Sequence, residues 1–191
     1  MPLVLDLTFP HAWEAEVLTV RPMILPARQF VYPARVEEVE RGALEIMVRP
    51  TLAAGPFLAT CALGFAGDSV PSGVWACPDP AWICAVAGGY AYLIDTSEPA
   101  RWEQMVYRPV TNVTVVAEHE LLVFAGFQSL LAWGRKGKVW ETGRLSWDGL
   151  RMTSIRGETL LGLGWDMNTD RELEFSVNLK TGEHQGGGYL V

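Results

Sequence analysis

A short motif of apolar residues, a glycine and an aromatic residue occurs three times in this chain at a regular spacing. The copies WICAVAGGY, ELLVFAGF and ETLLGLGW align Gly88, Gly126 and Gly164, which are 38 residues apart (88 to 126 and 126 to 164). A second marker has the same spacing, since Trp102 and Trp140 are also 38 residues apart. Self-similarity with a period of roughly 20 to 50 residues is typical of repeat architectures. The spacing therefore predicts a repeated structural unit.

Each copy consists of short β-forming runs that are separated by turn residues. In the central copy these runs are NVTVVAE, ELLVFAG, SLLAWG and KVWETGRL. Gly137 and Gly182 stand between such runs, where glycine adopts at no steric cost the positive φ that tight hairpins need. Convincing helical periodicity is absent. The pattern predicts an all-β fold of repeated four-stranded antiparallel meanders.

We expect the whole chain to form a single β domain, because 49% of its 191 residues are hydrophobic and only 19% are charged. An N-terminal strand segment is expected in residues 1–35, and repeats near residues 36–73, 74–111, 112–149 and 150–188. The repeat at 36–73 lacks both the glycine–aromatic pair and the tryptophan. The alternating residues 3–9 are a candidate for the edge strand that it lacks.

Residues 74–188 resemble the blades of quinoprotein-type and other bacterial β-propellers, in which such meanders bury their faces against one another. The resemblance implies a small ring or an open stack of blades, and a β-sandwich is the alternative. Trp102 and Trp140 are then expected to be equivalent core residues between neighbouring sheets. The segments GGYAYLIDT and GRLSWDGLR are also similar to stretches of bacterial proteins of no assigned activity, so the resemblance implies no function.

The charge balance argues against a polyanionic partner. The chain has 15 Lys and Arg residues against 22 Asp and Glu residues, a net charge of −7. Because nucleic-acid affinity comes largely from neutralising phosphates, we expect no nucleic-acid partner. We expect no membrane partner either, since no apolar run approaches the length of a span and the N-terminus lacks the features of a signal peptide.

The cysteines indicate a reducing compartment. Three cysteines do not make a disulfide framework in a chain of this size, so we expect free buried thiols and a cytoplasmic location. We expect neither a metal site nor a cofactor, because no histidine pair has zinc-ligand spacing. The residues considered are Cys61, Cys77, Cys84, His11, His119 and His184.

Meander topology brings two Trp–Asp pairs to one face of the loops. The candidate binding residues on this face are Trp147, Asp148, Trp165, Asp166 and Asp170. Core tryptophans with turn-capping aspartates are the simpler interpretation of the same pattern. The segment DMNTD also has oxygen ligands at the alternate positions of a calcium loop, but Arg171 replaces the glycine that such a loop needs. A polar turn is the favoured interpretation there.

No catalytic set is visible, and we assign no catalytic residue. The segment FAGDSVPSG resembles the Gly-Asp-Ser block of SGNH-type esterases, but the partner Asp-x-x-His pair is absent and a turn is favoured. The sequence therefore favours a non-enzymatic binding module for a protein or a small polar ligand. A hydrolase or lyase that uses the loop-face carboxylates and a carbohydrate-binding protein are the alternatives. The oligomeric state stays open.

Overall fold

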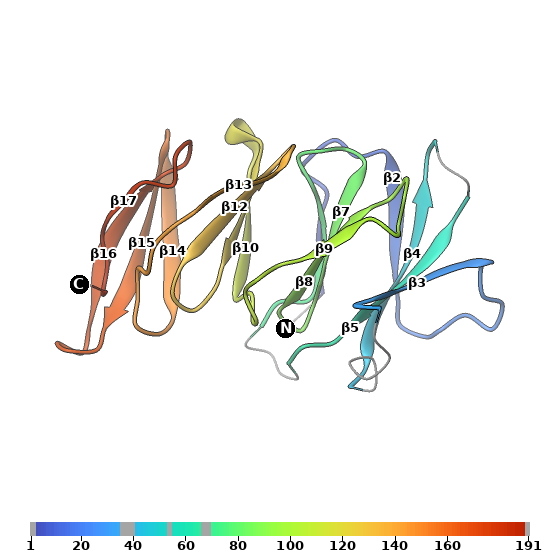
Figure 1. The fold of residues 1–191 in the computed structure, drawn as a ribbon, viewed down its shortest axis with the longest axis horizontal. Coiled ribbons are helices and arrows are strands. Elements are labelled where there is room, and N and C mark those ends of the chain that lie inside the picture. The colour runs from blue at the N-terminus through green and yellow to red at the C-terminus, as the bar shows by residue number, and fades with distance from the viewer. Residues whose placement is uncertain (1–2, 35–40, 53–54, 66–69, 190–191) are drawn as a thin grey trace. The chain divides into compact units, whose positions relative to one another are not determined.

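The computed structural model describes residues 3–34, 41–52, 55–65 and 70–189, and its regular structure is almost entirely β. Four sheets of four or five strands are formed by the described residues (Figure 1). The helical structure in this part of the chain is one 3-10 turn, Ala117–His119. The prediction of an all-β fold is confirmed. The chain divides into two compact units between Val110 and Thr111, and the sequence pattern did not predict this division.

In the unit that begins at Thr111, two antiparallel meanders follow one another along the chain. The first has the order β10-β11-β12-β13, with strands Asn112–Val116, Leu121–Ala125, Leu130–Gly134 and Gly137–Glu141. The second has the order β14-β15-β16-β17, with strands Leu150–Arg156, Thr159–Asp166, Arg171–Asn178 and His184–Gly186. These strands lie in the ranges 112–149 and 150–188 that the repeat spacing indicated.

One hydrophobic core contains residues from both meanders. Val123 of β11 and Leu130 of β12 belong to the same buried cluster as Leu160 of β15 and Phe175 of β16. A Cβ at Gly162 would lie 2.2 Å from Cζ of Phe175, so the missing side chain leaves room for the phenyl ring. Burying apolar surface stabilises a fold by about 25 cal/mol per Å², so this shared core is the main source of stability for the unit.

In the unit that ends at Val110, the two sheets are less regular. One has the order β1-β6-β7-β8-β9, with strands Val4–Asp6, Gly73–Ala76, Trp82–Ala87, Tyr90–Asp95 and Trp102–Gln104. The other has the order β2-β4-β5-β3, with strands Trp13–Leu18, Ala43–Pro50, Phe57–Ala62 and Arg28–Tyr32.

The second of these sheets corrects the meander predicted for residues 36–73. Only β4 and β5 come from that range, while β2 and β3 come from the segment expected to precede it. Strand β3 pairs with β5 in parallel, which a meander does not allow. The range contains too few strand-forming runs to build a sheet alone. The beginning of the range, residues 36–40, and the Gly-Asp-Ser block, residues 67–69, lie outside the described residues.

Residues near the N-terminus do supply an edge strand, but to the other sheet. Strand β1 pairs in parallel with β6, and Val4 lies opposite Gly73. A Cβ at Gly73 would lie 2.1 Å from the carbonyl oxygen of Val4, and the glycine has a φ of +156°. A side chain at Gly73 would therefore prevent the close approach of the two strands.

The repeated glycines stand at the end of the second strand of the runs β6–β9, β10–β13 and β14–β17. Gly88 and Gly126 follow β7 and β11 directly, and Gly164 lies two residues before the end of β15. The repeated tryptophans differ more. Trp140 is buried, whereas Trp102 is half-buried, with its ring centroid 5.4 Å from that of Tyr32 in the neighbouring sheet. The two tryptophans are equivalent in position, since each lies on the fourth strand of its run, β9 or β13. They are not equivalent in burial, so the prediction that both are core residues is wrong for Trp102.

The cysteine prediction is confirmed, because Cys61, Cys77 and Cys84 are free and buried. Burial raises the pKa of each thiol well above its ordinary value. Within the described part of the chain, no helix has the length and apolar character needed to cross a membrane.

Candidate functional site

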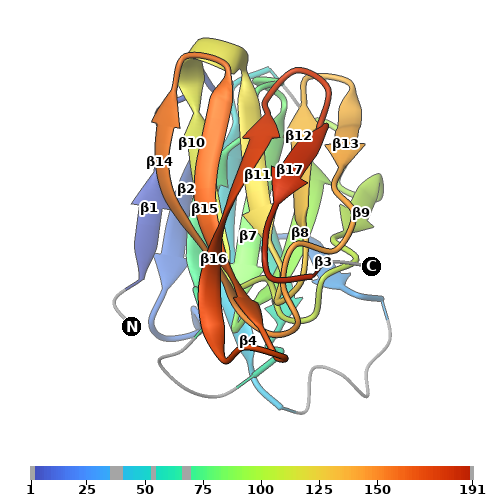
Figure 2. The same cartoon turned by 90° about the vertical axis from the view of Figure 1, so that its left-hand side faces the viewer.

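Three connections of the second unit lie at one end of its two meanders (Figure 2). They are the β11–β12 turn, the β13–β14 connection and the β15–β16 turn, and the β14–β15 turn lies at the opposite end. All five predicted site residues are on or beside these connections. We call the aromatic, apolar and arginine side chains at this end the turn-end patch: Phe127, Arg144, Trp147, Trp165, Met167 and Tyr189.

Backbone and hydroxyl hydrogen bonds hold the connections together. The backbone N–H of Trp147 donates to the carbonyl oxygen of Trp165 at 3.0 Å. The Ser146 hydroxyl oxygen accepts from the backbone N–H of Trp165 at 2.9 Å and donates to the carbonyl oxygen of Gly149 at 2.8 Å. The side-chain amide of Gln128 donates to the carbonyl oxygen of Trp147 at 3.2 Å. The two predicted tryptophans are therefore adjacent, although 18 residues separate them (147 to 165).

An arginine is stacked on two aromatic rings at this end. The guanidinium carbon of Arg144 lies 4.7 Å from the ring centroid of Trp147 and 4.5 Å from that of Tyr189. The two rings meet edge to face, with centroids 4.8 Å apart. The guanidinium also donates to the carbonyl oxygens of Ser146 and Trp147, at 3.1 and 3.0 Å. These contacts fix the position of the positive charge.

The carboxylates have different environments. Asp170 accepts a hydrogen bond of 3.0 Å from the indole N–H of Trp165. Asp166 is buried, and its oxygens accept from the backbone N–H of Asn168 at 3.0 Å and from the Thr169 hydroxyl at 2.6 Å. These hydrogen bonds, first that of Thr169, hold the pKa of Asp166 below its ordinary value. Asp148 is exposed on the β13–β14 connection.

The geometry of Asp166 confirms the polar-turn interpretation of DMNTD. Its carboxylate accepts hydrogen bonds from the backbone N–H of Asn168 and from the hydroxyl of Thr169, two and three residues further along the turn. Among the described residues, no group of three or more His, Cys, Asp or Glu side chains is arranged to hold a metal ion. Asp166 therefore stabilises the turn and Asp170 orients Trp165.

Four residues of the turn-end patch were not predicted as site residues. Two of them, Phe127 and Met167, are large apolar side chains that are 46% and 51% exposed. Arg144 and Tyr189 carried no sequence signal, since their contacts depend on the path of the C-terminal segment. That path requires Gly188, where a Cβ would lie 2.2 Å from the backbone of Trp165.

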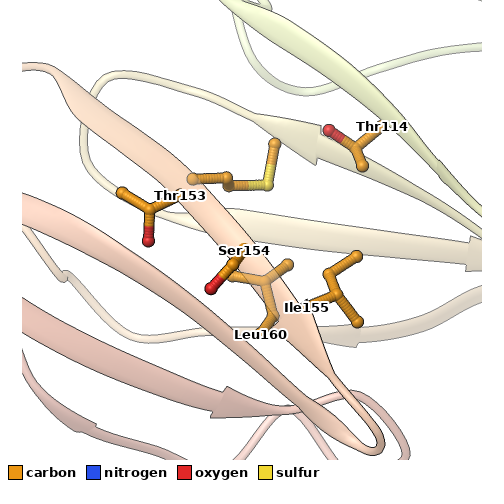
Figure 3. A pocket seen from close by; sticks show the side chains of 6 residues that line it. Thr114, Thr153, Ser154, Ile155 and Leu160 are labelled. Carbon is orange, nitrogen blue, oxygen red and sulfur yellow. The ribbon is translucent and has the colours of Figure 1, made fainter.

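A separate hollow of about 210 Å³ lies beside the first strands of the two meanders (Figure 3). Thr114 of β10 and Thr153 and Ser154 of β14 contribute hydroxyls, and Leu160 belongs to its apolar lining. A β-bulge between Met152 and Ser154 leaves Thr153 out of the ladder. Bulges often re-aim side chains in this way. The hollow is small and has no charged lining residue among those described.

Another hollow, of about 280 Å³, lies at the end opposite to the turn-end patch. Its lining includes His119, Arg135 and Lys180. The positive charge there is partly neutralised, because Lys180 forms an ion pair with Glu158. His119 is also engaged, with its Nε2 3.0 Å from the carbonyl oxygen of Gly157.

Comparison with known proteins adds no assignment: no protein-family model matches the sequence, and no curated protein was found to be similar to it.

Proposed function

We propose that this chain is a non-enzymatic binding module that holds a protein partner through the turn-end patch. The observation that carries the proposal is the exposure of Phe127 and Met167 at the same end of the two meanders as the stack of Arg144, Trp147 and Tyr189. Aromatic residues, methionine and arginine are enriched at protein interfaces. Exposed apolar side chains with a polar rim are typical of such surfaces. Asp148 and Asp170 supply that rim.

The same contacts disfavour the two alternatives. A sugar stacks on an open indole face, but Arg144 and Tyr189 already occupy positions against the Trp147 ring. A general acid needs a raised pKa, whereas hydrogen bonds lower the pKa of Asp166 and occupy both of its oxygens. A protein surface is the ligand that large exposed side chains on three adjacent turns fit best.

The proposal includes the architecture and the location. We propose that the sheets are blades of a propeller-like stack, and the support is that two consecutive meanders share one core in the second unit. We propose a cytoplasmic location, and the support is that Cys61, Cys77 and Cys84 are free and buried, as expected in a reducing compartment.

A peptide library displayed on phage and selected on the immobilised chain tests the proposed function. Selected peptides are expected to bind the wild-type chain, and Phe127→Ser and Met167→Ser are each expected to weaken that binding by about tenfold or more. Both changes remove exposed side chains, so the melting temperature is expected to stay nearly constant. Titration calorimetry with one selected peptide gives the dissociation constants.

Val139→Ser is the matched control. Val139 is 49% exposed and lines the hollow at the opposite end of the same unit. It is expected to leave peptide binding unchanged. The proposal is wrong if the selected peptides bind both patch variants as tightly as the wild-type chain, or if Val139→Ser weakens binding as much as they do.

A further inference from the structure

The sheet β14-β15-β16-β17 has one face in the core and another face outside it. Along β15, Leu160 is buried in the core cluster, while Leu161 and Leu163 are half-buried on the other face. Successive side chains of a strand point to opposite faces, so the strand pairing assigns every other residue to the same face. We call this second face the outer face. Its residues are Arg151, Ser154, Arg156, Thr159, Leu161, Leu163, Trp165, Glu172, Glu174, Ser176, Asn178 and Gln185.

Charge is segregated across the outer face. Arg151 and Arg156 lie on β14, the leucines lie on β15, and Glu172 and Glu174 lie on β16. Arg151 forms an ion pair of 3.1 Å with Glu172, and both side chains are more than half exposed. Within the described residues, Glu174 and Arg156 have no ion-pair partner. A hollow of about 390 Å³ lies between them, with Leu161 and Leu163 in its lining.

The strand register places three of these residues in one row. Arg151 is the pairing partner of Leu163, and Leu163 is the pairing partner of Glu174. The row therefore runs from a positive side chain over an apolar centre to a negative side chain. The next row towards the β14–β15 turn on this face is Ser154, Leu161 and Ser176, which is uncharged.

We propose that the outer face binds the outer face of a second copy of this chain. The two copies are related by a two-fold axis that is parallel to β15 and lies between the two faces. Such an axis places β14 opposite β16 of the second copy and keeps each row at the same position along the strands. Leu163 then meets Leu163 of the second copy, and Arg151 meets Glu174 of the second copy, twice in each dimer. Leu161 likewise meets its own equivalent. The face is self-complementary, as a two-fold interface requires.

The charges also favour this axis over a two-fold axis that lies between the same two faces but runs perpendicular to the strands. A two-fold axis perpendicular to the strands would place β14 on β14 and β16 on β16. Arginines would then face arginines, and Glu172 and Glu174 would face the same two residues of the second copy. Like charges that face each other across an interface disfavour association.

The small size of the face indicates a weak contact. With β15 eight residues long and usual strand spacings, the face covers about 450 Å² on each copy, or about 900 Å² in total. This area lies below the range of stable standard interfaces, so we expect a weak dimer with a dissociation constant of roughly 10 to 100 μM. Salt is expected to weaken it, because the pairs lie at a solvated rim.

Sedimentation velocity of the full chain at increasing concentration tests this assignment. The wild-type chain is expected to dimerise reversibly, and Arg151→Glu or Glu174→Arg alone is expected to weaken dimerisation by about tenfold or more. An equimolar mixture of the two single variants is expected to restore it, because each introduced charge then faces its opposite. The chain that carries both substitutions is expected to self-associate as the wild type does.

Arg135→Glu and Glu118→Arg are the matched controls, since they make the same charge changes at exposed residues of the first meander. Both are expected to leave dimerisation unchanged, and circular dichroism checks that every variant is folded. The proposal is overturned if the wild-type chain stays monomeric up to about 1 mM, far above the dissociation constant expected for a face of this area. It is equally overturned if the single variants dimerise normally, or if their mixture does not regain association. The two surfaces share Trp165, but none of the variants substitutes a residue of the turn-end patch, so peptide binding to each variant is measured separately from its dimerisation.

Discussion

The indole N–H of Trp140 donates a hydrogen bond of 2.6 Å to the carbonyl oxygen of Leu179, which links the last strand of one meander to the end of the third strand in the next. The ring is 6% exposed and belongs to the core cluster. Gly182 closes over it, since a Cβ there would lie 2.8 Å from Cβ of Trp140. One residue thus supplies packing and a buried polar contact between two sheets.

Trp140→Ala is expected to reduce the free energy of unfolding by about 3 to 5 kcal/mol, because it removes a large core side chain and leaves a cavity. Trp140→Phe keeps most of the packing but leaves the Leu179 carbonyl oxygen without its donor, so a loss of about 1 to 2 kcal/mol is expected. Urea titration followed by circular dichroism measures both. Equal losses for the two variants would show that the ring contributes little beyond its N–H group.

Trp102→Ala is expected to cost less, about 2 kcal/mol, because Trp102 is only half-buried and its removal exposes less new apolar surface. Its ring contacts Tyr32 and Tyr92, with centroid distances of 5.4 and 6.3 Å. The same urea titration applies. A loss as large as that of Trp140→Ala would contradict the difference in burial between the two tryptophans.

The sequence predicted the meanders because strand alternation and turn glycines are local signals. It did not predict the sheet β2-β4-β5-β3, because the parallel pairing of β3 with β5 joins segments whose pattern carries no mark of pairing direction. Trp147 and Trp165 were placed together correctly, since meander topology alone brings their connections to one end. Arg144 and Tyr189 depend on a tertiary contact of the C-terminal segment with Trp165, and residue spacing does not encode such a contact.

Asp166 is expected to make the stability of its turn depend on pH. Its folded pKa lies below the ordinary value because the Thr169 hydroxyl and the Asn168 N–H bond to the charged form. The stabilisation is therefore present above the ordinary aspartate pKa, about 4, and is lost as the pH falls through the lower folded value. Asp166→Ala should lower the melting temperature at pH 7, and its difference from the wild type should shrink in acid.

Asp148→Ala serves as the control for this titration, since Asp148 is exposed and lies on the neighbouring connection. It is expected to leave the melting temperature at pH 7 nearly unchanged, because its side chain is exposed. Thermal unfolding monitored by circular dichroism between pH 3 and pH 7, a range that brackets the ordinary aspartate pKa of about 4, makes the measurement. A constant difference between Asp166→Ala and the wild type across that range would contradict the assignment.

The buried thiols are expected to be inert in the folded chain. Burial raises the pKa of Cys61, Cys77 and Cys84, so the reactive thiolate is scarce and reagents have no access to the sulfur atoms. A thiol-specific chromogenic disulfide at pH 8 should label none of them within minutes in the native state. All three should react after denaturation. Rapid labelling of any one in the native chain would reveal local opening of its strand.

Trp147 offers a test of an unmet hydrogen bond. Its indole nitrogen is buried and has no acceptor within the described residues. A buried donor without a partner costs about 1 to 3 kcal/mol, and Trp147→Phe removes that donor while keeping a ring against Arg144 and Tyr189. The free energy of unfolding is therefore expected to stay within about 0.5 kcal/mol of the wild-type value or to rise, since the lost ring area offsets the gain.

Trp165→Phe is the matched comparison, because it deletes an indole N–H that does have an acceptor, the Asp170 carboxylate at 3.0 Å. That variant is expected to lose about 1 kcal/mol. Urea titration of both variants under one set of conditions gives the contrast. If Trp147→Phe loses more than Trp165→Phe, the indole N–H of Trp147 has an acceptor in solution, and the stack with Arg144 and Tyr189 is then held by a hydrogen bond as well as by ring packing.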